Sequence, residues 1–106
     1  IDKIFVHAWY KCYIFVNQKN IKNGWTRDRI VDEINLKGVP CFFGSCSEVY
    51  LEKSFLNTKF KPIHNLPNAK KLGEDSLMFL VHPTLSDIEI KKTCHAIQDV
   101  MSRASK

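Results

Sequence analysis

The chain has 106 residues, of which 44% are hydrophobic, 25% charged and 11% aromatic, which suffices for one domain but not for two. Its four glycines and four prolines exclude a collagen-like or disordered chain, and no apolar run approaches the roughly 20 residues that span a bilayer. Sixteen basic and eleven acidic residues give a net charge of +5, but the basic residues are scattered, which argues against a nucleic-acid interface. We therefore expect one globular domain with no nucleic-acid partner and no membrane contact.

The first part of the sequence predicts a strand, a loop and a helix. Residues 7–16, HAWYKCYIFV, are rich in aromatic and β-favouring side chains and predict a strand buried on much of both faces. The turn-forming residues in 17–24 predict a loop. Thr26 then caps a helix that ends at Gly38, where a left-handed residue is favoured. The apolar positions of this helix recur at helical spacing: Ile30, Val31 and Ile34.

The middle of the chain predicts one strand and two short helices. Residues 39–43, VPCFF, predict the second strand. Ser47 is suited to cap a short helix over 48–55. A polar loop follows, and then 66–73 predicts another short helix with Pro67 at an early position.

The last part predicts a strand and a long helix. Residues 76–81, SLMFLV, form the third strand. Ser86 and Glu89 make a capping box, S-x-x-E, that opens the final helix. Its apolar stripe keeps helical spacing over four turns, through Ile90, Cys94, Ile97, Met101 and Ala104.

Three strands that alternate with helices predict an α/β (α+β) fold, a two-layer sandwich of a small three-stranded sheet with helices packed mainly on one face. Because the strands are apolar on both sides, we expect the second face of the sheet to be covered from elsewhere. The first residue is Ile1 rather than Met, and no signal peptide follows it. We therefore expect 1–106 to be a single domain cut from a longer protein.

The cysteines indicate a reducing compartment. An even count would suit two disulfides in a secreted chain, but these cysteines lie mostly within apolar segments, as buried free thiols do. Only Cys41 and Cys46 are close in sequence, with no second pair, so we predict no zinc site. The expected location is the cytoplasm. All four thiols are then free: Cys12, Cys41, Cys46 and Cys94.

A cysteine–histidine nucleophile pair would need Cys46 next to His64 or His82, and nothing in the sequence brings these residues together. His95 follows Cys94 on the final helix, off its apolar stripe, as a solvated residue does. We predict no catalytic residue and no metal ligand in this chain.

Ser45, Cys46 and Ser47 lie at the predicted strand-to-helix turn. Small hydroxyls and backbone N–H groups at a helix start can hold an anion. The same residues are also typical of a plain N-cap. From composition alone, both interpretations stay open.

Six segments in this order resemble the C-terminal domain of the DegT/DnrJ/EryC1/StrS family of PLP-dependent sugar aminotransferases. The resemblance runs over nearly the whole chain, and its specificity comes from the order and spacing of the segments. They are the opening H-x-x-Y-K-x-Y (His7, Tyr10, Lys11, Tyr13), R-D-x-I (Arg27, Asp28, Ile30), G-V-P (Gly38, Val39, Pro40), GSCSEVYLEKSF from Gly44, LPNAKKLG from Leu66, and SLMFLVHPTLS from Ser76.

The resemblance implies a function for the longer protein. Members of the family move an amino group, commonly from glutamate, to a keto sugar linked to a nucleotide, and pyridoxal 5'-phosphate (PLP) supplies the chemistry. The cofactor lysine belongs to the large N-terminal domain, so this chain is expected to bind no cofactor and to be inactive alone. Its implied partners are that large domain, the nucleotide-sugar substrate and a second copy in a homodimer.

The resemblance also points to substrate-binding residues. Many members carry an H-Y-P-x-x-H type segment after the second strand, where this chain has Phe43 to Glu48 and then Tyr50. The roles of those histidines therefore do not transfer. The substrate-binding residues that we predict in their place are Ser45, Cys46, Ser47, Glu48 and Tyr50.

A different function class is compatible with the same composition. The chain would then be a self-contained small α/β module that binds an anionic or nucleic-acid ligand. That function predicts a sheet covered on both faces and an affinity that falls steeply with salt.

Overall fold

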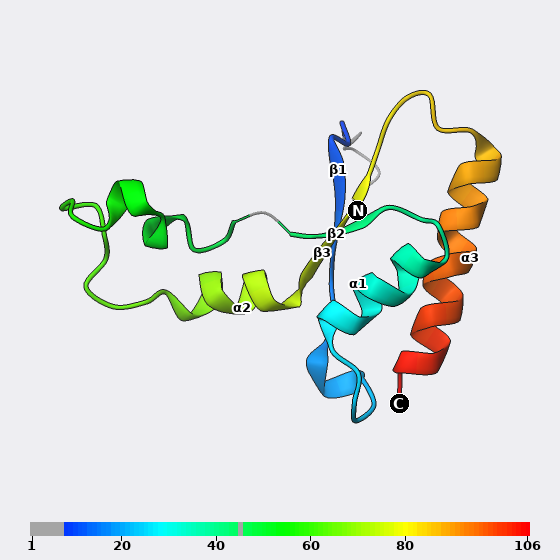
Figure 1. Ribbon diagram of the computed structural model, residues 1–106, viewed down its shortest axis with the longest axis horizontal. Helices are drawn as coiled ribbons and strands as arrows, with labels where there is room; N and C mark the ends of the chain where they lie inside the picture. Colours follow the sequence, from blue (N-terminus) through cyan, green and yellow to red (C-terminus); the bar gives the residue numbers. More distant parts are fainter. Residues whose placement is uncertain (1–7, 45) are drawn as a thin grey trace, which may run out of the picture.

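The computed structural model describes residues 8–44 and 46–106 (Figure 1). Three strands and three α-helices alternate along the chain, together with three short 3-10 helices at Gln18–Asn20, Val49–Leu51 and Lys53–Phe55. In chain order the main elements are β1 (Lys11–Phe15), α1 (Arg27–Leu36), β2 (Cys41–Phe43), α2 (Pro67–Asp75), β3 (Ser76–Leu80) and α3 (Asp87–Ala104).

The three strands form one antiparallel sheet in the order β1-β3-β2. Phe79 of β3 stands between Cys12 and Cys41, and this row faces the core. The next row, Tyr13–Met78–Phe42, therefore lies on the opposite face, because successive side chains alternate along a strand.

The helices α1 and α3 pack on one face of this sheet, and in Figure 1 both lie to the right of the strands. Between them and the sheet is one apolar core, to which α1, α3 and all three strands contribute. This confirms the predicted two-layer α+β sandwich. The core residues are Val16, Ile21, Ile30, Val31, Ile34, Val39, Cys41, Leu77, Phe79, Ala96, Val100 and Ala104.

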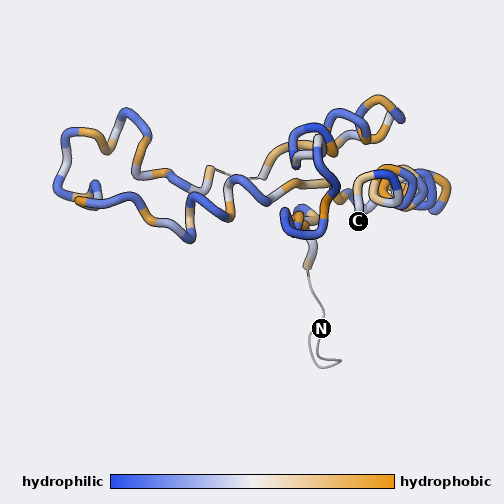
Figure 2. Tube along the Cα trace, turned by 90° about the horizontal axis from the view of Figure 1, so that it is seen from below, coloured by the Kyte–Doolittle hydropathy of each residue, from blue (hydrophilic) through white to orange (hydrophobic). Residues whose placement is uncertain are grey.

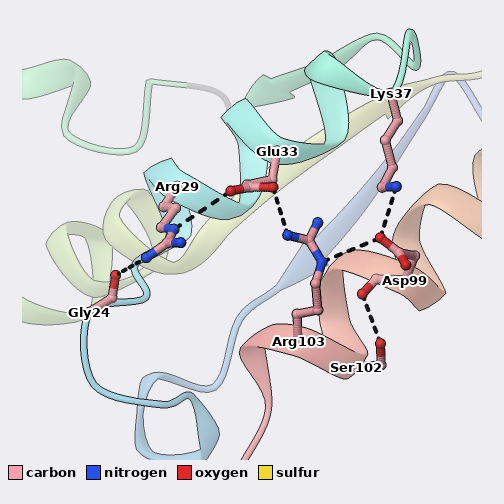
Figure 3. Close-up of polar contacts among 7 residues, drawn as sticks. All are labelled: Gly24, Arg29, Glu33, Lys37, Asp99, Ser102 and Arg103. Carbon is pink, nitrogen blue, oxygen red and sulfur yellow. Dashed lines mark hydrogen bonds and ion pairs between the residues drawn. The ribbon is translucent and has the colours of Figure 1, made fainter.

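A polar network joins α1 to α3 at the solvent side of the core (Figure 3). Arg103 donates to Glu33 at 2.9 Å and lies 3.4 Å from Asp99. Lys37 pairs with the same Asp99 at 2.8 Å. The charges on the two helices thus alternate in sign across their contact, which favours this pairing of the helices.

Residues 44–75, which we call the arm, project from the side of the strands opposite to α1 and α3 (Figure 1). The arm leaves from the end of β2, carries the two later 3-10 helices, and returns through α2 to β3. It extends the molecule to 49 Å, with a radius of gyration of 16.5 Å, whereas a compact domain of this length has about 13 Å. In Figure 2 hydrophobic and hydrophilic residues alternate along it.

The helix caps predicted at Thr26, Ser86 and Gly38 are confirmed. The Thr26 hydroxyl accepts from the Arg29 N–H at 3.1 Å. Ser86 and Glu89 make both hydrogen bonds of the capping box. Gly38 follows α1 with φ +69°, the left-handed conformation expected there.

Several predicted boundaries and burial patterns are wrong. The first strand begins at Lys11 rather than at residue 7, and much of it is exposed on both faces; the predicted start, His7, lies outside the described residues. The second strand covers only Cys41–Phe43, because Pro40 cannot donate to the ladder. No α-helix forms over 48–55. Two 3-10 turns stand there, and Ser47 caps neither of them.

The two later helices also differ from prediction. α2 continues through Gly73 to Asp75. The stripe of α3 is only partly buried: Ile90 and Cys94 are exposed, while Ala96, Val100 and Ala104 are buried. The first turns of α3 lie beyond the packed core, so only its second half buries a face.

No helix among the described residues is both long and apolar enough to cross a membrane.

Candidate functional site

The predicted substrate-binding residues lie at the root of the arm, where its outgoing limb leaves the sheet. Of these, Ser45 lies outside the described residues. Ser47 and Glu48 are half-buried, Tyr50 is buried and Cys46 is exposed. The structure thus brings four of the five residues to one segment.

The two limbs of the arm approach closely at its root. A Cβ atom at Gly44 would stand 2.0 Å from the Ser76 hydroxyl oxygen and 2.7 Å from its Cβ. A Cβ atom at Gly73 would stand 2.2 Å from the Ser47 hydroxyl oxygen. At Gly44 a larger residue would therefore clash with Ser76, whereas at Gly73 the nearest atom is a hydroxyl oxygen at the end of a side chain.

Tyr50 joins the limbs one step further out. Its hydroxyl donates to Glu48 at 2.6 Å and accepts from the Leu66 N–H at 2.9 Å. The hydrogen bond to Glu48 raises the pKa of Tyr50, so the phenol stays protonated. Both side chains thereby fix the course of the arm.

Cys46 lies beside a carboxylate rather than a base. Its thiol donates to Glu52 at 3.4 Å. This hydrogen bond, with the negative charge of Glu52, raises the pKa of the thiol. A nucleophilic cysteine requires the opposite shift, so the neighbouring carboxylate does not activate this thiol.

Arg27 fastens the arm to the body of the domain. Its Nη1 donates to the Gly73 carbonyl at 2.9 Å and to the Ser76 carbonyl at 2.5 Å. Its guanidinium group also lies 4.7 Å from the centre of the Phe43 ring. Sequence reasoning missed this role, because Arg27 was identified only as part of a helix start, and both acceptors are backbone atoms.

One segment of the arm is rich in lysine. Residues 53–73 contain five lysines and no acidic residue: Lys53, Lys59, Lys61, Lys70 and Lys71. The rest of the chain then holds 16 − 5 = 11 basic residues against 11 acidic ones. The arm as a whole has a net charge of only +1, because it also contains Glu48, Glu52, Glu74 and Asp75. Segment 53–73 exposes apolar side chains as well, such as Phe60 (70%) and Ile63 (95%).

The histidines do not form a site with the cysteines in the described part of the chain. His82 uses its Nδ1 in a local turn, 2.7 Å from the Thr84 hydroxyl. His64 and His95 are exposed. No group of three or more histidine, cysteine, aspartate or glutamate side chains suited to a metal occurs within 8–44 and 46–106.

An apolar cleft of about 370 Å³ lies elsewhere, between the ends of β1 and β3 and the first turns of α3. Ile90 and Cys94 line this cleft, which is why both side chains are exposed. The cleft is lined by almost no polar surface apart from His82 and Thr93. Its walls thus offer few groups that could orient a polar substrate.

Comparison with known proteins finds a similar solved structure. The chain is similar to a solved structure, the X-ray structure of the aminotransferase from Psychrobacter cryohalolentis, with 59% sequence identity and a TM-score of 0.86. The similarity covers 92% of this chain and 25% of that chain. This chain therefore has the fold of about a quarter of an aminotransferase. No protein-family model and no curated protein sequence matches it.

Proposed function

We propose that the chain is the small C-terminal domain of a PLP-dependent aminotransferase of the DegT/DnrJ/EryC1/StrS type, which aminates a nucleotide-linked keto sugar. The observation that carries this proposal is the 59% identity to an aminotransferase over 92% of the chain. Identity at this level over nearly every element, combined with the six motifs, favours it over a self-contained binding module.

We propose that the cofactor is held outside this chain. A PLP enzyme holds its cofactor through a lysine and a phosphate cradle, and such a lysine lies in a closed pocket. Every described lysine is exposed except Lys11, which is half-exposed on an edge strand. We therefore assign the cofactor, and the chemistry it supplies, to the part of the enzyme that this chain does not match.

The role that we assign to this chain is to shape the substrate pocket. Its predicted contacts are Ser45, Cys46, Ser47, Glu48 and Tyr50, of which the last four lie at the arm root. Lys70 and Lys71 pair with Glu74 and Asp75, whereas Lys59 and Lys61 have no acidic residue within five positions. Lys59 and Lys61 would therefore attract the anionic diphosphate of a nucleotide sugar. The partners of the chain are then the large domain, the substrate and a second subunit, and its proposed location is the cytoplasm.

A domain replacement tests the proposal. This chain would replace the matching quarter of the Psychrobacter cryohalolentis aminotransferase, and amino transfer would be measured on that enzyme's own substrates. We expect the chimera to be active, since 59% identity conserves most of the contacts. The control is the same enzyme with the quarter deleted, which should be inactive.

A second measurement uses the chain alone, incubated with PLP and glutamate. We expect no turnover, because the described lysines are solvated. Turnover with one lysine modified in stoichiometric amount would refute the proposal, as would a folded chimera that transfers no amino group.

A further inference from the structure

One face of the sheet is apolar and has no helix on it among the described elements. It consists of alternate residues of the three strands, and we call it the open face. Among its residues, Phe15 is 58% exposed and Phe42 45%, while Met78 is buried at the centre of the row. Leu80, at the end of β3, also lines the cleft next to α3. The full set is Lys11, Tyr13, Phe15, Phe42, Ser76, Met78 and Leu80.

An antiparallel sheet with one solvated face normally carries polar residues there. On the open face the only charged residue is Lys11, at its edge, and the only small polar one is Ser76, which is buried. Aromatic side chains gathered in this way mark an interface rather than a solvent surface. The opposite face already packs on α1 and α3, so a partner has only this face of the sheet to cover.

We propose that the open face is the surface on which this domain docks against the large domain of the aminotransferase, a step that rests on the proposed function. The neighbour that shares this fold has three further quarters of chain beyond the match, which is ample to cover a small sheet. The open face is nearly uncharged, as the core of a permanent interface is.

The position of the arm also favours the large domain as the partner that covers the open face. The arm and the open face lie on the same side of the strands, away from α1 and α3 (Figure 1). A large domain on the open face would therefore also lie beside the arm root with its predicted substrate-binding residues. Docking at this face would thus bring the cofactor-bearing domain and the arm root together.

Side-chain footprinting tests the docking directly. Hydroxyl radicals would label Phe15 and Phe42 in the isolated chain and in the active chimera, with Leu36 as the internal control. Leu36 is 83% exposed on α1, away from the open face. We expect labelling of Phe42 to fall about tenfold in the chimera, because a side chain at an interface core is shielded from solvent, while labelling of Leu36 stays the same.

Paired substitutions give the second measurement. Phe42→Glu in the chimera should lower amino transfer by about a hundredfold, since a displaced domain misplaces the substrate contacts. Leu36→Glu, the matched control, should not. In the isolated chain both variants should remain folded, because both side chains are exposed there.

The outcomes separate the two proposals. Unchanged labelling of Phe42 in a folded chimera would overturn the docking, whatever its activity. Protection of Phe42 in a chimera without activity would support the docking and contradict the proposed function. A dimer of the isolated chain that protects Phe42, with no protection in the chimera, would assign the face to a second copy and overturn the proposal. A chimera that does not fold would contradict both.

Discussion

Arg27 and Ser76 are 49 residues apart in the sequence, yet the guanidinium group of Arg27 donates to the Ser76 carbonyl at 2.5 Å. The same Nη1 donates to the Gly73 carbonyl at the end of α2, where a cation is favoured by the helix dipole. One side chain at the start of α1 thus fixes both the last turn of α2 and the start of β3. The arm is attached to the body through this point.

Replacing Arg27 by lysine should weaken this attachment although it keeps the charge. A lysine ammonium group is compact, and it does not reproduce the planar guanidinium group that lies over Phe43. We expect the free energy of unfolding to fall by about 2 kcal/mol, because at least one carbonyl loses a charged donor. Urea unfolding followed by circular dichroism measures the difference.

Arg29→Lys is the control for that substitution. Arg29 lies in the first turn of the same helix and also has a carbonyl acceptor, Gly24 at 2.9 Å, and an aromatic ring, Trp25 at 4.3 Å. It differs from Arg27 in being about half exposed, in having one carbonyl acceptor instead of two, and in its long ion pair with Glu33, at 3.8 Å. Arg29→Lys should therefore lower the free energy of unfolding by less than about 1 kcal/mol. Equal losses at positions 27 and 29 would show that the two carbonyl contacts contribute nothing specific.

Gly44→Ala should destabilise the chain by about 1–3 kcal/mol, the usual cost of overpacking. The new methyl group would stand 2.7 Å from the Cβ of Ser76, a buried residue that cannot move aside. Thermal unfolding of the single variant and of Gly44→Ala/Ser76→Gly measures the clash. The double variant should recover part of the loss, and no recovery would contradict the proposed contact.

Gly73→Ala is the matched comparison to Gly44→Ala. At Gly73 the only atom that the new methyl group would meet closely is the hydroxyl oxygen of Ser47. Ser47 can rotate that oxygen away, since its Cβ would lie 3.4 Å from the new methyl group. Alanine also favours a helix over glycine by about 1 kcal/mol. We therefore expect little change at position 73, and stabilisation when Ser47→Ala is added.

Asp75 should make the stability depend on acid pH. Lys71 donates a hydrogen bond to it, and with Gln18 and the nearby Arg27 charge this lowers the pKa of Asp75 below its usual 3.8, although burial opposes the shift. A carboxylate whose folded-state pKa is lowered contributes stability above the unfolded value and loses it as the pH falls through the folded value. The stabilisation is therefore present at neutral pH and lost in strong acid.

Asp75→Asn should remove this acid dependence and lower the stability at neutral pH. Urea unfolding at about pH 7 and about pH 3 measures both effects, since that interval includes the usual pKa of aspartate. Glu74→Gln is the control. The ion pair of Glu74 with Lys70 is exposed and 3.8 Å long, so this substitution should lower the free energy of unfolding by less than about 1 kcal/mol. If the free energy of unfolding of Asp75→Asn fell between these two pH values as much as that of the unsubstituted chain, the assignment would be refuted.

Glu52 should govern the reactivity of Cys46. Its carboxylate raises the pKa of the thiol by accepting the hydrogen bond and by its charge. Glu52→Gln should therefore increase the thiolate fraction and speed alkylation by iodoacetamide at about pH 8.5, near the usual pKa of a thiol. Peptide mass spectrometry follows Cys46, with the exposed Cys94 as internal control. If Glu52→Gln left the alkylation of Cys46 unchanged or slowed it, while that of Cys94 stayed the same, the contact between Cys46 and Glu52 would be contradicted.

The helices of the body were predictable because their signals are local. Thr26 and Gly38 mark the ends of α1, and the pair Ser86–Glu89 opens α3, each within a few residues of the turn that it forms. The arm was less predictable. Residues 48–55 have helical spacing, but their only buried residue is Tyr50, whose partner Leu66 lies 16 residues away, so no face was available to stabilise an α-helix.

For the candidate site, the sequence indicated the segment but not its contacts. Cys46, Ser47, Glu48 and Tyr50 do lie together at the arm root, and their role toward substrate stays a prediction. The close approach of Gly44 to Ser76 and the Arg27 clamp were not predictable, because they depend on backbone atoms whose position follows from strand pairing.

By itself, the sequence determined the two-layer fold, the helix caps and the expectation that one face of the sheet needs a cover, because periodicity and capping act within a few residues. Only the tertiary structure decided that this face contains the row Tyr13–Met78–Phe42, and that the five lysines of 53–73 lie on a projecting arm. Those features depend on the register of strands that are distant in sequence. A shift of one residue in that register would turn every side chain of a strand to the other face.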